Sequence, residues 1–338
     1  MATAKLRSPA EWEKQEATWL AFPHHPKNWA GERGVKIRKF YFGLILKIAK
    51  FQNVNVLVPK DFAIPAEMFK KLAHSKYQAK FIPMPTNDIW IRDYGPFFVK
   101  RSDKTEIATT KFNAWGAKFP PFSKDDAVPS RIAKLLGMPL AEVPYIFEGG
   151  AIEFNSDGLA MTTLPCLTGK NRNAKADVAK LKAALKKALG LKDILVLPDG
   201  LCGDHTDGHI DNVARFVTNE RIVMAWEEAD TENKVRLTEV KKQIEAWLQK
   251  HYGKKAKVDT LQIPPQKQLG AETLPASYMN YIYVNGGLIY PKYYAKLDKV
   301  VAEYFKSVYP DREIIGVDCK TVIEEGGSLH CMSKHQSA

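Results

Sequence analysis

The sequence predicts an α/β protein made of repeated units, each with two short strands, an amphipathic helix and a further buried strand. This order recurs four times, in hairpins that begin near residues 96, 151, 212 and 280. A fifth unit forms only when the two chain ends are paired, so the units should close into a ring. Because no linker or low-complexity tract interrupts them, we expect a single domain over residues 1–338.

The first two units are marked by short apolar runs. PFFVKR and TEIATTKF form the first hairpin, and the second turns at Ser156-Asp157-Gly158, residues that favour tight turns. The predicted hairpin, helix and strand cover 96–112, 129–137 and 143–147 in the first unit, and 151–163, 174–190 and 194–197 in the second.

The third and fourth units repeat this order. Their hairpins turn near Asn219 and at Asn285-Gly286, and an amphipathic helix follows each. The predicted hairpin, helix and strand cover 212–226, 232–251 and 258–263 in the third unit, and 280–290, 295–308 and 313–317 in the fourth.

The fifth unit joins the ends of the chain. SLHCMS (328–333) should pair with TWLAF (18–22), and a helix within 34–51 and the strand VNVLV (54–58) complete the unit. Residues 60–85 fit none of the units, so we expect an insertion there.

Composition limits the class of protein. The chain has 338 residues, 45% hydrophobic and 26% charged, which indicates a globular protein with a large core. The N-terminus has no apolar signal region, and no window resembles a membrane span of about 18 apolar residues. We therefore expect a cytoplasmic protein without a membrane partner. The cysteines lack C-x-x-C spacing, so neither zinc nor a disulfide framework is expected; they are Cys166, Cys202, Cys319 and Cys331.

The net charge of +12 raises the possibility of a nucleic-acid-binding protein. However, many lysines fall in 175–190 and 239–257, on the polar side of predicted amphipathic helices. A solvated helix face explains them better than a nucleic-acid surface does. A basic nucleic-acid-binding protein with a structural thiol remains the alternative outside the enzymes.

Unusual polar clusters lie where the hairpins begin. They are NDIWIRDYGP (87–96), FEGGAIEF (147–154), GDHTDGHIDN (203–212) and EEGGSLHCMS (324–333). Equivalent positions in a ring face the same axis, so these segments should converge. They would bring together Asp93, Glu148, His209, Asp211 and Cys331.

Each cluster also has an ordinary structural explanation. Asp93 could form an ion pair with Arg92, and Glu148 could be a strand-end carboxylate beside turn glycines. A cysteine near a chain end is commonly an apolar filler. His209 and Asp211 could form a satisfied pair on one face of a strand. Trp90 and Trp115, which are candidate substrate-binding residues, could instead be core residues. If all of these explanations held, unrelated polar residues would have to occur by chance at matched positions of the repeated units.

Three converging carboxylates without metal-ligand spacing favour a cationic substrate, because a guanidinium donates paired N–H groups to carboxylate oxygens. Its carbon is resonance-stabilised, so attack needs a thiolate, and a bound cation lowers the thiol pKa from about 8.5. His209 would protonate the departing ammonia and then take a proton from water. Hydrolysis would leave a ureido product.

The ordered motifs resemble those of the agmatine deiminase family, which includes bacterial-type peptidylarginine deiminases and belongs to the guanidine-modifying pentein superfamily. The likeness spans nearly the whole chain. It is carried by EWEKQEATWLAFPHHPKNW (11–29), NDIWIRDYGP, FNAWG (112–116), EGG (148–150), TDGHID (206–211), ASYMNY (276–281) and GGSLHC (326–331). One departure is Ser328, where the family commonly has asparagine in G-G-G-N-I-H-C.

The resemblance implies a five-bladed α/β propeller, no metal or organic cofactor, and in many members a homo-oligomer. It implies Cys331 as the nucleophile and His209 as the acid-base residue. His330, next to the nucleophile, should point to the opposite face of a strand. The implied substrate-binding residues are Asp93, Glu148 and Asp211, with Trp90 along the substrate's methylene chain and Asn280 near the site.

The favoured hypothesis is hydrolysis of agmatine, a small cationic guanidine, to N-carbamoylputrescine and ammonia. Free arginine and peptidyl-arginine remain alternative substrates, because the loops that select the substrate tail are not predicted by the sequence.

Overall fold

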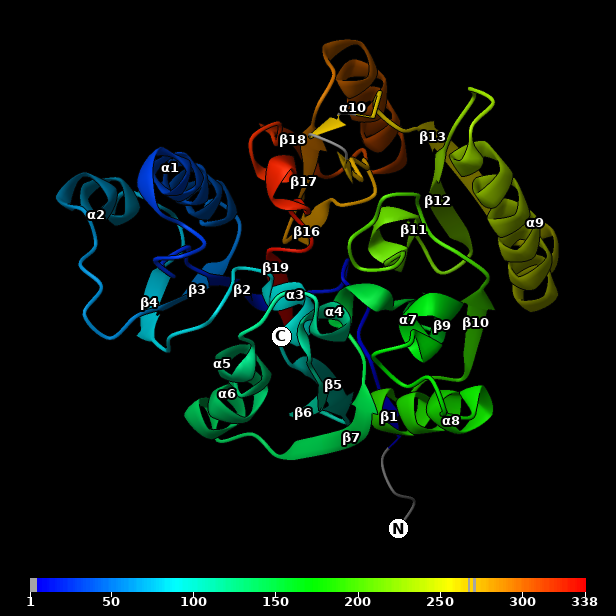
Figure 1. The fold of residues 1–338 in the computed structure, drawn as a ribbon, viewed down its shortest axis with the longest axis horizontal. Helices are drawn as coiled ribbons and strands as arrows, with labels where there is room; N and C mark the ends of the chain where they lie inside the picture. Colours follow the sequence, from blue (N-terminus) through cyan, green and yellow to red (C-terminus); the bar gives the residue numbers. More distant parts are fainter. Residues whose placement is uncertain (1–4, 267, 270–271) are drawn as a thin grey trace.

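The computed structural model describes residues 5–266, 268–269 and 272–338. These residues form five sheets of three or four strands, and a small ribbon of β14 (Gln268–Leu269) and β15 (Glu272–Thr273). Figure 1 shows the sheets distributed around the middle of the molecule, with the longer helices towards its periphery. The predicted mixed α/β class is confirmed.

All four predicted hairpin–helix–strand units are present. In each, an antiparallel hairpin is followed by a helix, and the next strand pairs in parallel with the second hairpin strand, because a parallel connection needs a long crossover. The units are β5 (Phe97–Arg101), β6 (Lys104–Lys111), α6 (Val128–Leu136) and β7 (Leu140–Ile146); β8 (Glu153–Phe154), β9 (Leu159–Thr163), α8 (Val178–Leu189) and β10 (Asp193–Leu197); β11 (Ala214–Phe216), β12 (Arg221–Trp226), α9 (Glu232–Tyr252) and β13 (Lys257–Gln262); β16 (Ile282–Val284), β17 (Gly287–Lys292), α10 (Ala295–Val308) and β18 (Glu313–Asp318). A short strand, β1 (Leu6–Arg7), extends the first sheet beside β5.

The chain ends pair as predicted, in a different register. β19 (Ser333–Ser337) runs antiparallel to β2 (Gln15–Ala21), and after α1 (Gly31–Ile48) the strand β3 (Asn53–Val58) pairs in parallel with β2. The predicted strand over 328–333 is wrong. Its residues bend into a turn, because the Met332 N–H donates to the Ser328 carbonyl and the Ser333 N–H to the His330 carbonyl. Cys331 therefore lies in a turn.

The segment 60–85 extends the sheet of the closing unit. It contains α2 (Ala66–Ala73) and β4 (Ala79–Pro83), and β4 pairs in parallel with β3 at the edge of the sheet. The expected insertion is thus an added helix and strand.

Short helices and 3₁₀ turns connect the units. Three of them, α3 (Ile91–Tyr94), η1 (Gly149–Ala151) and η2 (Ile210–Asn212), lie where hairpins begin. The others are α4 (Ala114–Ala117), α5 (Ser123–Asp126), α7 (Leu164–Thr168), η3 (Gly253–Lys255) and η4 (Val322–Glu325).

Amphipathic helices cover the sheets. In α8 the leucines at every fourth position, Leu181, Leu185 and Leu189, are buried, whereas Lys180 and Lys187 are exposed. The basic residues of this helix therefore lie on a solvated face, as the sequence predicts. No helix of the described residues has the length and apolar character needed to cross a membrane.

Candidate active site

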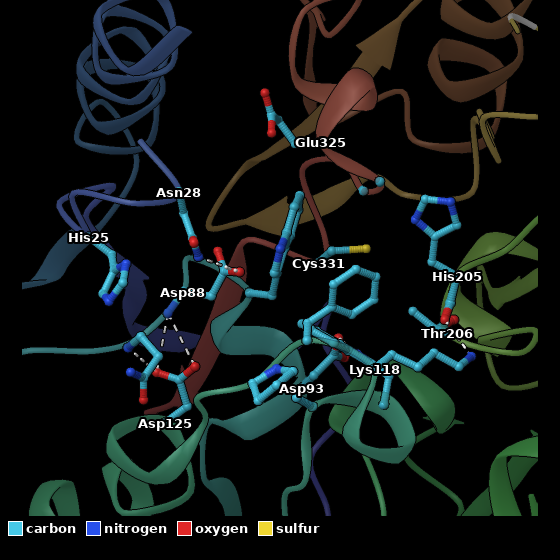
Figure 2. Close-up of a pocket in the computed structure, with 18 of the residues that line it drawn as sticks. His25, Asn28, Asp88, Asp93, Lys118, Asp125, His205, Thr206, Glu325 and Cys331 are labelled. Carbon is cyan, nitrogen blue, oxygen red and sulfur yellow. Dashed lines mark hydrogen bonds between the residues drawn. The ribbon is translucent and has the colours of Figure 1, made fainter. Parts of the chain in front are cut away.

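Four distant segments carry the predicted polar residues, of which Asp93 and Cys331 line one cavity. Asp93 lies on α3, Glu148 precedes η1, and Asp211 lies on η2. Cys331 lies in the turn before β19 and lines a cavity of about 490 Å³. Figure 2 shows its sulfur pointing into this cavity. Trp90, Asp93 and Trp115 also line it.

The predicted polar residues meet at Gly150. A methyl carbon added there would lie 2.6 Å from Asp93 Oδ1, 2.7 Å from His209 Nδ1 and 3.1 Å from Asp211 Oδ2. All three atoms therefore surround one point, and the missing side chain of glycine leaves room for them. This convergence is the central geometric feature of the site.

His209 and Asp211 reach that point from a 3₁₀ turn, so the expectation of an extended strand is wrong. The His209 backbone N–H donates to Asp204 Oδ2 at 3.1 Å, which fixes the start of the turn. Nor do the two side chains form the satisfied pair considered above, because Asp211 contacts His330 instead.

Cys331 is held by a neighbouring amide. Asn280 Nδ2 donates to the sulfur at 3.0 Å, and Asn280 Oδ1 accepts from the His330 N–H at 2.8 Å. The thiol lies 3.8 Å from Asp211 Oδ2. Burial, and then the charges of Asp211 and Asp93, raise the pKa of Cys331 well above its usual value. Both causes favour the protonated thiol.

Asp93 is oriented by two donors. The Trp115 indole N–H reaches Oδ2 at 2.9 Å, and the Gly150 N–H reaches Oδ1 at 2.9 Å. Burial raises the pKa of Asp93 to about 7, although these hydrogen bonds oppose the shift. Near neutral pH this carboxyl is thus divided between its acid and carboxylate forms.

Glu148 has one occupied oxygen. Arg172 Nε donates to Oε1 at 2.7 Å, whereas Oε2 has no hydrogen-bond partner among the described residues. Burial raises the pKa of Glu148, and the Arg172 guanidinium opposes that shift. Oε2 therefore keeps an unused acceptor, although the Glu148 side chain is fully buried and does not line the cavity.

His209 is fully buried, and neither ring nitrogen has a hydrogen-bond partner within the described part of the chain. Nδ1 lies 3.6 Å from Asp93 Oδ1, and Nε2 lies 4.0 Å from Glu148 Oε2. Burial, and then the Arg172 and Lys118 charges, lower the pKa of His209 well below its usual value. The neutral imidazole is therefore favoured, and it can accept a proton.

The remaining predicted residues support the site. Trp90 packs its ring over Gly327, where a methyl carbon would come within 2.5 Å of the ring. Trp115 contacts Asp93 from α4, and Asn280 fixes the nucleophile turn.

Three contacts were missed by sequence reasoning. Arg172 pairs with Glu148 across 24 residues, Glu11 contacts His330 across 319 residues, and His330 reaches Asp211. Only Glu11 carried a signal, since it begins the motif EWEKQ.

Glu11, Glu153 and His330 have ligand atoms within 4.8 Å of one another, close enough to hold a metal ion. Cations already occupy both carboxylates, however. Arg215 donates to Glu11 at 3.0 Å and to Glu153 at 2.8 Å, and Arg92 donates to Glu11 at 2.6 Å. The donor set therefore fits a buried ion-pair network better than a metal site.

The residues that line the cavity include both acidic and basic side chains. In Figure 2, His25, Asp88 and Asp125 lie on one side of Cys331, and Lys118, His205 and Thr206 on the other. Arg33 and Glu325 also line it and form an ion pair.

Comparisons with known proteins agree with this geometry. The sequence profile of the Porphyromonas-type peptidyl-arginine deiminases matches residues 7–337. A cysteine-to-serine variant of C. jejuni agmatine deiminase, solved with substrate bound, is 30% identical and superposes with a TM-score of 0.88, covering 100% of this chain and 98% of that one. The agmatine deiminase of Pseudomonas fluorescens (strain SBW25) is 28% identical over 98% of this chain and 95% of its own length.

Proposed function

The chain belongs to the Porphyromonas-type peptidyl-arginine deiminase family, and we propose that it hydrolyses agmatine to N-carbamoylputrescine and ammonia. The observation that carries this proposal is the convergence of Asp93, His209 and Asp211 at Gly150, with the Cys331 thiol 3.8 Å from Asp211. The C. jejuni relative with substrate bound supports agmatine as the substrate, and its cysteine-to-serine change is consistent with a cysteine nucleophile.

The guanidinium binds between carboxylates. Asp211 Oδ1 and Glu148 Oε2 are buried acceptors without partners in the described residues, and a guanidinium supplies N–H donors in a planar fork. Asp93 contributes a third carboxylate. Burial, and then the carboxylate charges, raise the pKa of the Cys331 thiol, and the cation opposes this shift, so substrate binding itself prepares the nucleophile.

Reaction proceeds through a covalent thiouronium. The Cys331 thiol gives its proton to the neutral His209, and the thiolate attacks the guanidinium carbon. The imidazolium of His209 then protonates the leaving nitrogen, which departs as ammonia. Water next gives a proton to His209, and the resulting hydroxide adds to the same carbon. The carbon–sulfur bond then breaks with its electron pair going to sulfur, and the Cys331 thiolate takes the proton back from His209. The hydroxyl of the departing group loses its proton to solvent, which leaves the neutral ureido product.

At the level of the whole chain, we propose that the five units form the blades of a five-bladed propeller within one catalytic domain. In this proposal the enzyme is a hydrolase of linear amidines that uses no cofactor, acts in the cytoplasm and forms a homo-oligomer.

Free arginine or a peptidyl-arginine is the second candidate. The family description favours it, as do the basic side chains at the cavity mouth, Lys118 and Arg33, which could meet a substrate carboxylate.

A ureido assay across agmatine, free arginine and a peptide ending in arginine separates these candidates. The proposal predicts the highest kcat/KM for agmatine, by at least about tenfold, which corresponds to one well-placed interaction with the tail. The highest value for arginine or for the peptide would overturn the choice of substrate. No ureido product from any of the three would overturn the proposed reaction.

A further inference from the structure

His330 lies between two carboxylates. Its Nδ1 is 2.7 Å from Asp211 Oδ2, and its Nε2 is 2.8 Å from Glu11 Oε1. The imidazole is fully buried and does not line the cavity. A carboxylate only accepts hydrogen bonds, so each of these short contacts needs a proton, on the ring nitrogen or on the carboxyl.

The contact with Glu11 determines which atom carries one of these protons. Arg92 and Arg215 each donate to Glu11, at 2.6 Å and 3.0 Å. Burial raises the pKa of Glu11, but Arg92, His330 and Arg215 together hold it well below its usual range. Glu11 is therefore a carboxylate and accepts from a protonated Nε2.

The contact with Asp211 must then share a second proton. With Nε2 protonated, a neutral His330 presents a bare Nδ1 lone pair to Asp211 Oδ2. Two acceptors 2.7 Å apart repel each other unless one proton lies between them. The proton is bound to Asp211 in a neutral pair, or to His330 in a carboxylate–imidazolium pair.

We propose that His330 is a positioning residue for deimination: it takes the shared proton from Asp211 when a guanidinium binds, so that Asp211 meets the cation as a carboxylate. The O–H bond at Oδ2 breaks, the electron pair stays on the oxygen, and an N–H bond forms at Nδ1. No proton enters from solvent or leaves to it. This inference rests on the proposed function.

The surroundings favour such a transfer on binding. In the empty site, burial raises the pKa of Asp211 and lowers the pKa of His330, so the proton rests on Asp211. A guanidinium at the unpartnered Oδ1 stabilises the carboxylate instead, and Glu11 stabilises the new imidazolium. The other titratable groups facing the pair are Arg92, Arg215, Asp93, Glu153, Asp204, Lys334, His335 and Cys331.

Nitrogen NMR of ¹⁵N-histidine-labelled protein reads the ring directly. The Cys331→Ser variant keeps agmatine intact, and the spectrum of Cys331→Ser/His330→Asn identifies the His330 signals by their loss. We expect a protonated Nε2 in the empty protein and two protonated ring nitrogens after agmatine is added. A bare Nδ1 in both states, or a bare Nε2 in the empty protein, would overturn the inference.

The empty-state spectrum separates this inference from the proposed function. If the wild-type enzyme forms no ureido product from any guanidine, the proposed function fails. Protonation of Nε2 in the empty protein is still measured in that case, and a bare Nε2 would then refute the His330 assignment on its own.

Kinetics of His330→Asn give a second test. The asparagine amide can donate to Asp211 but cannot take up its proton, so Asp211 must release that proton to solvent before it binds the cation. We expect KM for agmatine to rise about tenfold with kcat changed less, and the acid limb of kcat/KM to move to higher pH by about one unit.

His335→Asn is the matched control. His335 is also buried and lies 3.3 Å from Glu11, but it does not contact Asp211. We expect its pH profile to match that of the wild type. An equal shift in both variants would show a merely structural effect on Glu11 and would contradict the inference.

Discussion

At the scale of single residues, burial sets the charge states of the site. Asp93, Glu148, His209, Asp211 and Cys331 all have pKa values shifted towards their neutral forms. Burial therefore disfavours the charges that bind and attack a guanidinium. The cation restores them, because an opposite charge lowers the pKa of acids and thiols.

The affinity for agmatine should consequently depend on pH through Asp93. Its pKa is about 7 in the empty site, so the carboxylate needed by the cation is lost as pH falls through 7. We expect KM to rise roughly tenfold for each unit below pH 7, since the carboxylate fraction falls by that factor. Initial rates between pH 5.5 and 8.5 check this. A KM that stays constant over this range would contradict the assignment of Asp93.

The raised pKa of Asp93 also makes the free energy of unfolding depend on pH. This free energy falls as pH rises, whereas the affinity for agmatine increases. An unfolded aspartate ionises near pH 4, whereas folded Asp93 keeps its proton up to about pH 7. The folded protein binds more protons in this window, so Asp93 lowers the free energy of unfolding as pH rises from about 4 to 7.

Arg172 and Glu11 show why single residues were the hardest to predict. Each lies far along the chain from its partner, and although Glu11 begins the motif EWEKQ, nothing in the local pattern of either residue indicates its partner. The proximity of Cys331 to the acids could be predicted because these residues recur at matched positions of the repeated units.

At the scale of elements, apolar periodicity predicted the helices and strands, because each buries one face over several turns or residues. It did not predict the short turns that carry the chemistry. η2 and the Cys331 turn are held by tertiary contacts, such as the Asp204 side chain that caps the start of η2. Sequence reasoning assumed strands at Asp211 and at Cys331, where the structure has turns. The alternation of side chains between the two faces of a strand therefore did not apply there.

The α4 turn carries Trp115, which contacts Asp93, and its backbone conformation costs free energy. Ala114, Trp115 and Ala117 have φ values of 54°, 55° and 62°, in the left-handed region, at about 1–2 kcal/mol for each such residue. The Asn113 side chain accepts from the Gly116 N–H at 2.9 Å, and Asn171 donates to the Gly116 carbonyl at 3.0 Å. These contacts hold the conformation that turns Trp115 towards Asp93.

Trp115→Phe should therefore impair catalysis. It removes the N–H that orients Asp93 and keeps an aromatic ring, and a hydrogen bond to a charged group is worth about 1.5–3 kcal/mol. We expect kcat/KM to fall by about 10–100-fold, measured by ammonia release.

Trp29→Phe is the control for this prediction. Trp29 also lines the cavity, and its buried indole N–H has no partner among the residues described. We expect less than about a threefold change, because no hydrogen bond is lost. Equal losses in the two variants would exclude a special role for the Trp115 N–H.

At the scale of the whole molecule, pairing of the two chain ends completes the sheet behind the nucleophile. β19 and β2 pair over Ser333–Ser337, and the Trp19 indole N–H donates to Gln336 Oε1 at 2.9 Å. The sequence predicted this pairing because four complete units left one hairpin unmade. Its register could not be predicted, since the turn at Cys331 depends on contacts with Asn280.

Gln336→Ala tests how much the contact between the two chain ends contributes to the stability of the fold. The substitution leaves the buried Trp19 N–H without an acceptor, which should cost about 1–3 kcal/mol of unfolding free energy in urea. Gln243→Ala on α9 is the control, because Gln243 is only half-buried and its hydrogen bond to Glu239 is exposed, and we expect a change within about 0.5 kcal/mol. Equal changes would indicate that the end-to-end contact contributes little.

The central claim is that the Cys331 sulfur forms a covalent bond with the guanidinium carbon. The most direct measurement is acid quenching of the enzyme during agmatine turnover, followed by peptide mass spectrometry. We predict that the peptide containing Cys331 gains the mass of agmatine less ammonia, and that Cys331→Ser shows neither adduct nor ureido product. An adduct on Cys166, Cys202 or Cys319, or unimpaired turnover by Cys331→Ser, would contradict the claim.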